Sequence, residues 1–248
     1  MFQLVEHRKV RADVLVTGLP GIGRVGHVAA AYIVSKLNLS PIATFYSDFF
    51  PPQVVIEQGG TVRLMQNMFY YVDAETPFIL LTGDTQVVGT TVAEHYAYAR
   101  ELLRIAKGYG VKEIYTMAGI DRGAQRLSIK PGVIAAVTHD EIAKKLEPLD
   151  VKLDSSGAIS GAAGLLLGLG KLEGLKGACL MGETSSQLTV HGDPAAAYAV
   201  LRVISDLLGL RIDLTDLKKA GDNLNMLLKR MLSPPKQEKR EERMDYIR

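Results

Sequence analysis

Residues 12–26 read Ala-Asp-Val-Leu-Val-Thr-Gly-Leu-Pro-Gly-Ile-Gly-Arg-Val-Gly. Residues 12–19 form a largely apolar run, which is typical of a strand covered on both faces. Pro20 and the glycines end this strand, and residues 23–38 then place apolar side chains near one face of a helix. A buried strand, a tight glycine-rich turn and a helix in this order are typical of an α/β fold.

The same alternation of apolar strands and helical segments continues along the chain. We expect a mixed, mostly parallel central sheet with helices on both faces. Thr91 and Glu94 have the spacing of a helix capping box, and Asp193-Pro194 has the pattern of an N-cap followed by proline. Further strands are predicted at 41–46, 78–81, 113–118, 133–137 and 178–181, and a hairpin is predicted between 54–57 and 61–71.

We expect a single α/β domain over residues 1–231, followed by a charged, flexible tail over residues 232–248. The domain ends in an amphipathic helix at about 213–231, whose apolar stripe either packs on its own domain or forms a subunit contact. For the subunit contact, the candidate oligomer-interface residues are Leu217, Leu224, Leu227, Leu228 and Met231.

Composition excludes several classes of protein. The 248 residues carry a formal charge of +2, and basic residues gather only in the tail, where acids accompany them, so we expect no nucleic-acid partner. The single cysteine, Cys179, rules out an intramolecular disulfide and a cysteine metal cluster. No leader-like apolar segment is visible, and the most apolar stretch, 158–169, is too short to cross a bilayer. We therefore expect a cytoplasmic protein without a membrane partner.

The glycine-rich turn is the first candidate site. Gly21, Gly23 and Gly26 fit the dinucleotide pattern G-x-G-x-x-G, and Asp48 follows at the loose distance of an acidic ribose contact. Glycines in such a turn let a pyrophosphate approach the backbone. They also let a strand and a helix pack closely, and we regard this packing role as their main one.

Polar residues after later strands form the second candidate site. Arg24, Asp84, Arg122 and Glu183-Thr184 follow predicted strands, and loops after parallel strands often converge on one crevice. Such a set could hold a phosphate and a nucleoside, or its members could simply cap helices and bind one another. The five histidines lack metal-ligand spacing. We expect no catalytic residue, no cofactor and no metal.

Several segments together resemble one family, the proteasome assembly chaperones. The segment Gly-Leu-Pro-Gly-Ile-Gly-Arg-Val-Gly resembles the family's opening Gly-[Phe/Leu]-Pro-Gly-x-Gly-x-x-Gly. The resemblance covers about residues 13–223, with the motifs in the family's order. The matching segments are 18–26, 47–50 with Pro52, 80–86, 159–166, 180–184 and 193–194.

The resemblance implies a non-enzymatic, archaeal-type protein with a fold similar to the nucleoside phosphorylases. It implies a homo-oligomer, or assembly with a paralogue. The partners implied are the proteasome core particle or its α-type subunits, for which the chain would be an assembly chaperone or an adaptor. The alternative is a nucleoside phosphorylase-like or nucleosidase-like enzyme that uses a crevice near Arg24, Asp84 and Glu183.

Some members of this family dock through a C-terminal motif of a hydrophobic residue, tyrosine and any residue. Here Tyr246 is third from the end rather than second, and Asp245 precedes it, so the sequence departs from the motif by one residue. The tail still offers apolar side chains within a charged stretch. The candidate partner-binding residues are Met244, Tyr246, Ile247 and Arg248.

Overall fold

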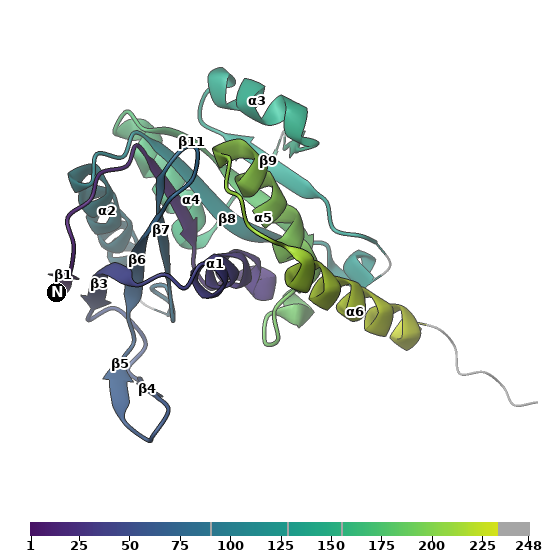
Figure 1. Ribbon diagram of the computed structural model, residues 1–248, viewed down its shortest axis with the longest axis horizontal. Coiled ribbons are helices and arrows are strands. Elements are labelled where there is room, and N and C mark those ends of the chain that lie inside the picture. Colours follow the sequence, from purple (N-terminus) through teal and green to yellow (C-terminus); the bar gives the residue numbers. More distant parts are fainter. Residues whose placement is uncertain (90, 128, 155, 233–248) are drawn as a thin grey trace, which may run out of the picture.

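The structure is a computed structural model that describes residues 1–89, 91–127, 129–154 and 156–232. Within these residues, nine strands form one sheet in the order β1-β3-β6-β7-β2-β8-β11-β9-β10 (Figure 1). The strands are β1 (Phe2–Glu6), β2 (Val14–Gly18), β3 (Pro41–Ser47), β6 (Asn67–Val72), β7 (Phe78–Gly83), β8 (Glu113–Asp121), β9 (Val133–Val137), β10 (Lys152–Leu153) and β11 (Lys176–Thr184).

The centre of the sheet is parallel. Strands β7, β2, β8 and β11 run in one direction. Antiparallel pairings add β6, β3 and β1 on one side and β9 on the other, and β10 pairs parallel with β9. The predicted mixed α/β architecture is therefore confirmed, with its parallel part at the centre. The likeness to nucleoside phosphorylases stays a prediction.

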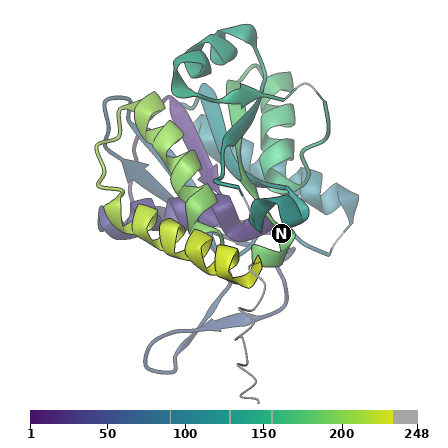
Figure 2. The same ribbon diagram turned by 90° about the vertical axis from the view of Figure 1, so that its right-hand side faces the viewer.

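Helices cover both faces of the sheet, as Figures 1 and 2 show. One face packs against α1, α5, α3 and the first part of α6, and the other against α2 and α4. Both faces of the central strands are apolar because both are covered, which explains why β2 and β7 are buried along their whole length. The helices are α1 (Val25–Lys36), α2 (Val92–Gly108), α3 (Asp140–Leu146), α4 (Gly161–Leu172), α5 (Pro194–Leu208) and α6 (Thr215–Leu232).

The two predicted helix starts are confirmed. The Glu94 carboxylate accepts a hydrogen bond from the Thr91 backbone N–H at 2.7 Å, which satisfies one donor at the start of α2. At α5, Asp193 accepts from the backbone N–H groups of Ala195 and Ala196, each at 3.1 Å, and Pro194 occupies the first helical turn.

The predicted hairpin is correct only in its first part. Strand β4 (Val54–Ile56) pairs with β5 (Val62–Leu64) in a separate two-stranded sheet, whereas β6 belongs to the central sheet between β3 and β7. Buried Asn67 fixes the start of β6, because its side-chain amide donates to the Thr85 carbonyl at 2.7 Å and accepts from the Tyr98 hydroxyl at 2.6 Å. Residues 54–64, which we call the arm, project from the body in both views (Figures 1 and 2).

Candidate functional site

The glycine-rich turn packs strand against helix, as the sequence suggested. A Cβ on Gly26 would lie 2.1 Å from the carbonyl oxygen of Met117 on β8, and a Cβ on Gly18 would lie 2.2 Å from the carbonyl oxygen of Gly26. Gly23 has φ +59°, and its Cβ would meet the Thr184 hydroxyl oxygen at 2.2 Å. The packing interpretation is therefore confirmed for these three glycines.

The dinucleotide interpretation finds less support in the geometry of the turn. The Gly23 N–H donates to the Thr189 hydroxyl at 3.1 Å, and the Arg24 N–H donates to the Gly21 carbonyl at 2.9 Å. Two backbone donors that a pyrophosphate would use are thus engaged. Asp48 is not a ribose contact, because it follows β3, three strand positions or about 14 Å from β2, and pairs with the Met1 amino group at 3.0 Å.

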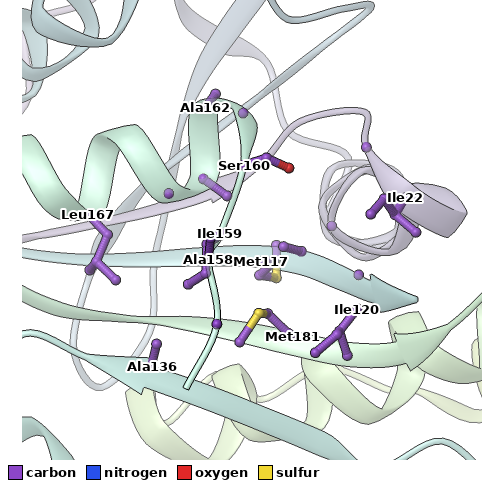
Figure 3. Close-up of a pocket in the computed structure, with 18 of the residues that line it drawn as sticks. Ile22, Met117, Ile120, Ala136, Ala158, Ile159, Ser160, Ala162, Leu167 and Met181 are labelled. Carbon is purple, nitrogen blue, oxygen red and sulfur yellow. The ribbon is translucent and has the colours of Figure 1, made fainter. Parts of the chain in front are cut away.

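A pocket of about 870 Å³ lies beside the turn, at the carboxyl ends of β2 and β8, and extends over Met181 of β11 to the end of β9. This edge of a parallel sheet is where α/β folds usually bind ligands. Figure 3 shows apolar side chains from the strands, from α4 and from the loop before α4 lining the pocket. They include Ile22, Met117, Ile120, Ala136, Ile159, Leu167 and Met181.

Gln86 ties two walls of this pocket together. Its side-chain Nε2 donates to the Pro20 carbonyl at 2.5 Å, and its Oε1 accepts from the Ala162 N–H at the start of α4 at 2.8 Å. The charged residues on the pocket wall are Asp121, Asp154 and Lys171. An uncharged, apolar group would fit this lining best.

None of Arg24, Asp84 and Glu183, the residues of the predicted crevice, lines this pocket. Glu183 accepts from Arg122 Nε at 2.9 Å and from the Gly132 N–H at 3.0 Å. Its carboxylate is thus held by structural contacts on both oxygens.

Asp84 is also engaged, with the arm. Arg63 Nη1 and Nη2 donate to the two Asp84 oxygens at 2.5 and 2.9 Å, and the Gln66 N–H donates to one of them at 3.0 Å. Burial alone would raise the pKa of Asp84, but these hydrogen bonds outweigh it and hold the pKa below its ordinary value of 3.8. The carboxylate anchors β5 to the end of β7.

This anchor has a pH signature that Asp84→Asn should remove. A lowered folded-state pKa stabilises the fold above the unfolded-state value, and the stabilisation disappears as the pH falls below about 4. We expect chemical unfolding to show a smaller loss of stability between about pH 5 and pH 2.5 in Asp84→Asn than in the wild type. Asp13→Asn, at an exposed ion pair with Lys112, is the control and should follow the wild type. Parallel curves for all three proteins would contradict this role of Asp84.

A buried ion pair lies behind the end of β11. Arg126 and Asp193 are 1% and 0% exposed, and Arg126 Nε and Nη2 donate to the two Asp193 oxygens at 2.6 and 2.8 Å. Asp193 also accepts from the Thr184 hydroxyl at 2.9 Å, in addition to capping α5. One carboxylate therefore joins the end of β11, the start of α5 and the loop after β8.

Arg126 extends the same network to α6. Its Nη2 donates to the Asn225 side-chain oxygen at 3.0 Å, and its Nη1 donates to the Ile129 carbonyl at 3.2 Å. A buried guanidinium needs such partners for its donors. Arg126 therefore orders the segment after β8 and helps to position α6.

Other reactive groups give no site. Cys179 is buried, and burial raises the pKa of its thiol to about 11, so it is not a thiolate at neutral pH. Among the described residues no cluster of three or more potential metal ligands is found. The helices in the described part of the chain include none that is long and apolar enough to cross a membrane.

A sequence model of the PAC2 family matches residues 15–232. The chain belongs to the PAC2 family. Among its relatives, an uncharacterised protein of Methanocaldococcus jannaschii is 35% identical over 218 residues, which cover 88% of this chain and 82% of that protein. The predicted relationship to the proteasome assembly chaperones is confirmed by this membership and by the solved structures described next.

Two solved structures from Pyrococcus furiosus are similar over nearly the whole chain. PbaB, described as an archaeal proteasome activator, is 36% identical with a TM-score of 0.83, covering 94% of this chain and 99% of that one. PbaA, described as an archaeal homolog of proteasome-assembly chaperone, is 28% identical with a TM-score of 0.74, covering 93% and 91%. The glycine-rich turn, the pocket and the Arg126–Asp193 pair thus belong to a PAC2 fold.

The stripe on α6 of this PAC2 protein divides between core and surface. Leu217 and Leu228 are buried, Leu224 is half-buried, and Leu227 is 52% exposed. Gly221 allows the close packing, because its Cβ would lie 2.7 Å from Ala195 Cα of α5. The buried positions are thus part of the chain's own core. The predicted oligomer contact stays a prediction, for which Leu227 is the most exposed of the four candidates whose side chains the structure describes.

Some predicted residues lie outside the described part of the PAC2 protein. They are the Met231 side chain and the partner-binding candidates Met244, Tyr246, Ile247 and Arg248.

Sequence reasoning missed three residues that organise the site. Arg63 lies in the short strand β5, Gln86 in a loop and Arg126 in the short 3-10 helix Gly123–Leu127, each without a repeated spacing. The nearest signal was the glycine-rich turn itself, whose Pro20 carbonyl accepts the hydrogen bond of Gln86. No pattern specified which side chain donates this hydrogen bond.

Proposed function

We propose that this PAC2 protein is a non-enzymatic, self-assembling partner of the proteasome core particle. It binds the particle or its α-type subunits and acts as an assembly chaperone, an adaptor or an activator. The similarity to PbaB over nearly the full length of both chains is the observation that carries this proposal. PbaB is described as a proteasome activator.

The chemistry of the site supports a non-catalytic role. Asp84 and Glu183, the carboxylates of the alternative enzyme hypothesis, are both held in ion pairs with arginines. A general base needs access to the proton it removes. These two carboxylates already accept hydrogen bonds from arginine side chains, so they are poorly placed to act as bases. The proposal therefore assigns the molecule's function to its surfaces.

The proposed contact with the proteasome is the tail, through Met244, Tyr246, Ile247 and Arg248. The test is capture of purified α-type subunits and of assembled core particles on the immobilised full chain. Capture should be lost with a variant that ends at Leu232 and weakened in Tyr246→Ala. Tyr96→Ala, at an exposed tyrosine of α2, is the matched control and should bind as the wild type does.

Two further readouts separate the roles. Faster peptide hydrolysis by preassembled core particles would identify an activator, whereas faster ring formation from free α-type subunits would identify an assembly chaperone. Capture of neither subunits nor particles by the full chain would overturn the proposal.

A further inference from the structure

The arm carries an apolar face that the described part of the chain leaves uncovered. Val54 and Ile56 of β4 and Val62 and Leu64 of β5 are between 51% and 74% exposed. Val54 pairs with Leu64 and Ile56 with Val62, and residues two apart on a strand share a face, so all four side chains lie together. A two-stranded hairpin with strands this short is marginal in water, unless one face is covered.

The opposite face of the arm is fixed to the body. Arg63, which faces the other way from its neighbours Val62 and Leu64, binds Glu57 within the arm and Asp84 at the end of β7. These ion pairs set the direction in which the arm projects. The apolar face therefore belongs to a hairpin whose position is fixed by the ion pair between Arg63 and Asp84.

A groove of about 510 Å³ continues this face at the base of the arm. Val54 and Leu64 of the arm line it, together with Pro51 and Pro52 and with Met1 and Phe2 at the start of β1. Strand β1 is the outermost strand on this side of the sheet, with its backbone paired only to β3 among the described strands. Polar residues also line the groove, among them Gln3, Gln53 and Asp48, whose carboxylate pairs with the Met1 amino group at 3.0 Å. The arm face and the groove therefore form one continuous surface at the edge of the fold, apolar on the arm and mixed at its base.

A second copy of this chain is the occupant that fits this surface. The four side chains of the face are aliphatic and uncharged, so they give a charged partner nothing to pair with. About a two-fold axis parallel to the strands, Val54 would meet Leu64 and Ile56 would meet Val62 of the other copy, so the face complements itself. A stable interface buries about 800 Å² on each partner. Four aliphatic side chains supply less than this area. The groove at the base of the arm provides further apolar area.

We infer that two copies of this chain associate through their arms, with the apolar faces packed on each other and the grooves at their bases completing the interface. The inference rests on the self-assembly included in the proposed function and names the surface that produces it. It places the contact on β4 and β5 rather than on the α6 stripe.

Cross-linking through a single introduced cysteine tests the contact directly. The natural Cys179 is free and buried, so Ile56→Cys adds the one accessible thiol in the described part of the chain. With a bis-maleimide cross-linker that spans about 10 Å, the separation of packed sheets, Ile56→Cys should give a covalent dimer as the main species. Leu172→Cys, at the 84%-exposed end of α4, should give only the background of random collisions. Equal yields from the two variants would overturn the inference.

Mass measurement in solution provides the second test. The double variant Ile56→Glu with Leu64→Glu should reduce the wild-type assembly to a smaller species, because like charges then meet across the interface. Leu227→Glu on α6 and Leu172→Glu on α4 should keep the wild-type mass. A wild-type mass of 27.0 kDa, or dissociation by Leu227→Glu alone, would contradict the arm interface.

The two proposals can fail separately. Capture of proteasome subunits by the wild type, without arm cross-linking in Ile56→Cys, overturns only the arm interface. Efficient cross-linking of Ile56→Cys, when the wild type captures no proteasome subunits, overturns only the proteasome role.

Discussion

Arg126→Met should lower the free energy of unfolding by about 3–5 kcal/mol, because it removes one partner of a buried ion pair. Asp193 would remain fully buried with the Thr184 hydroxyl and two backbone N–H groups but without a countercharge. The desolvated carboxylate, rather than the lost attraction alone, is the main cost. Chemical denaturation monitored by circular dichroism measures this loss.

The matched control is Arg122→Met in the same loop. Arg122 pairs with Glu183 at 2.9 Å, but both side chains are partly exposed, so the expected cost is about 1 kcal/mol or less. The double variant Arg126→Met with Asp193→Asn should be more stable than Arg126→Met alone, since asparagine still caps α5 and no buried charge remains. Equal losses for Arg122→Met and Arg126→Met would contradict the central role of the buried pair.

Gly26→Ala should lower the stability by about 3 kcal/mol, at the upper end for an overpacked site. The added Cβ would stand 2.1 Å from the Met117 carbonyl oxygen, so α1 or β8 would have to move. Neither can move alone, because β8 is held between β2 and β11 and α1 packs on the same sheet. Thermal and chemical unfolding measure the effect.

Gly168→Ala is the matched control for this substitution. Gly168 also lies within a helix, but its Cβ would meet nothing within 4 Å among the described atoms. Alanine has a higher helix propensity than glycine, so we expect Gly168→Ala to raise the free energy of unfolding by about 0.5–1 kcal/mol. A loss of similar size in both variants would contradict the close-packing explanation for Gly26, because an alanine at Gly168 meets no neighbouring atom.

Much of the fold could be predicted because local signals and tertiary structure agree. The buried strand before the glycine-rich turn, the capping box of α2 and the Asp193-Pro194 start of α5 all depend on neighbours in sequence. The edge strand β1 was missed because Phe2–Glu6 is short, partly charged and exposed on much of its surface. Its partner β3 lies about 40 residues away, and no local pattern records such a pairing.

The hairpin boundary could not be predicted for a related reason. Residues 61–71 read as one alternating strand, but the chain leaves the arm at Met65 and enters the central sheet at Asn67. The buried contacts of Asn67 with Thr85 and Tyr98 decide this change, and both partners are distant in sequence. An asparagine in an apolar stretch would ordinarily suggest a turn instead.

The candidate site was predicted in outline and not in its contacts. The sequence placed Arg24, Asp84 and Glu183 at the carboxyl ends of strands, which is correct for Asp84 and Glu183 on β7 and β11. The sequence could not show that Arg63 and Arg122 form ion pairs with these two carboxylates. The Arg126–Asp193 pair spans 67 residues of sequence, and an isolated arginine in a loop has no pattern to distinguish it.

The order of strands in the sheet also has a consequence for the protein during its synthesis. Strand β8 pairs with β2, made before it, and with β11, which ends at Thr184. At about 5–20 residues per second, translation from residue 121 to residue 184 takes roughly 3–13 s. For that interval the backbone groups of β8 that later pair with β11 have no native partner, so a nascent chain of this protein exposes the middle of its future sheet while still attached to the ribosome.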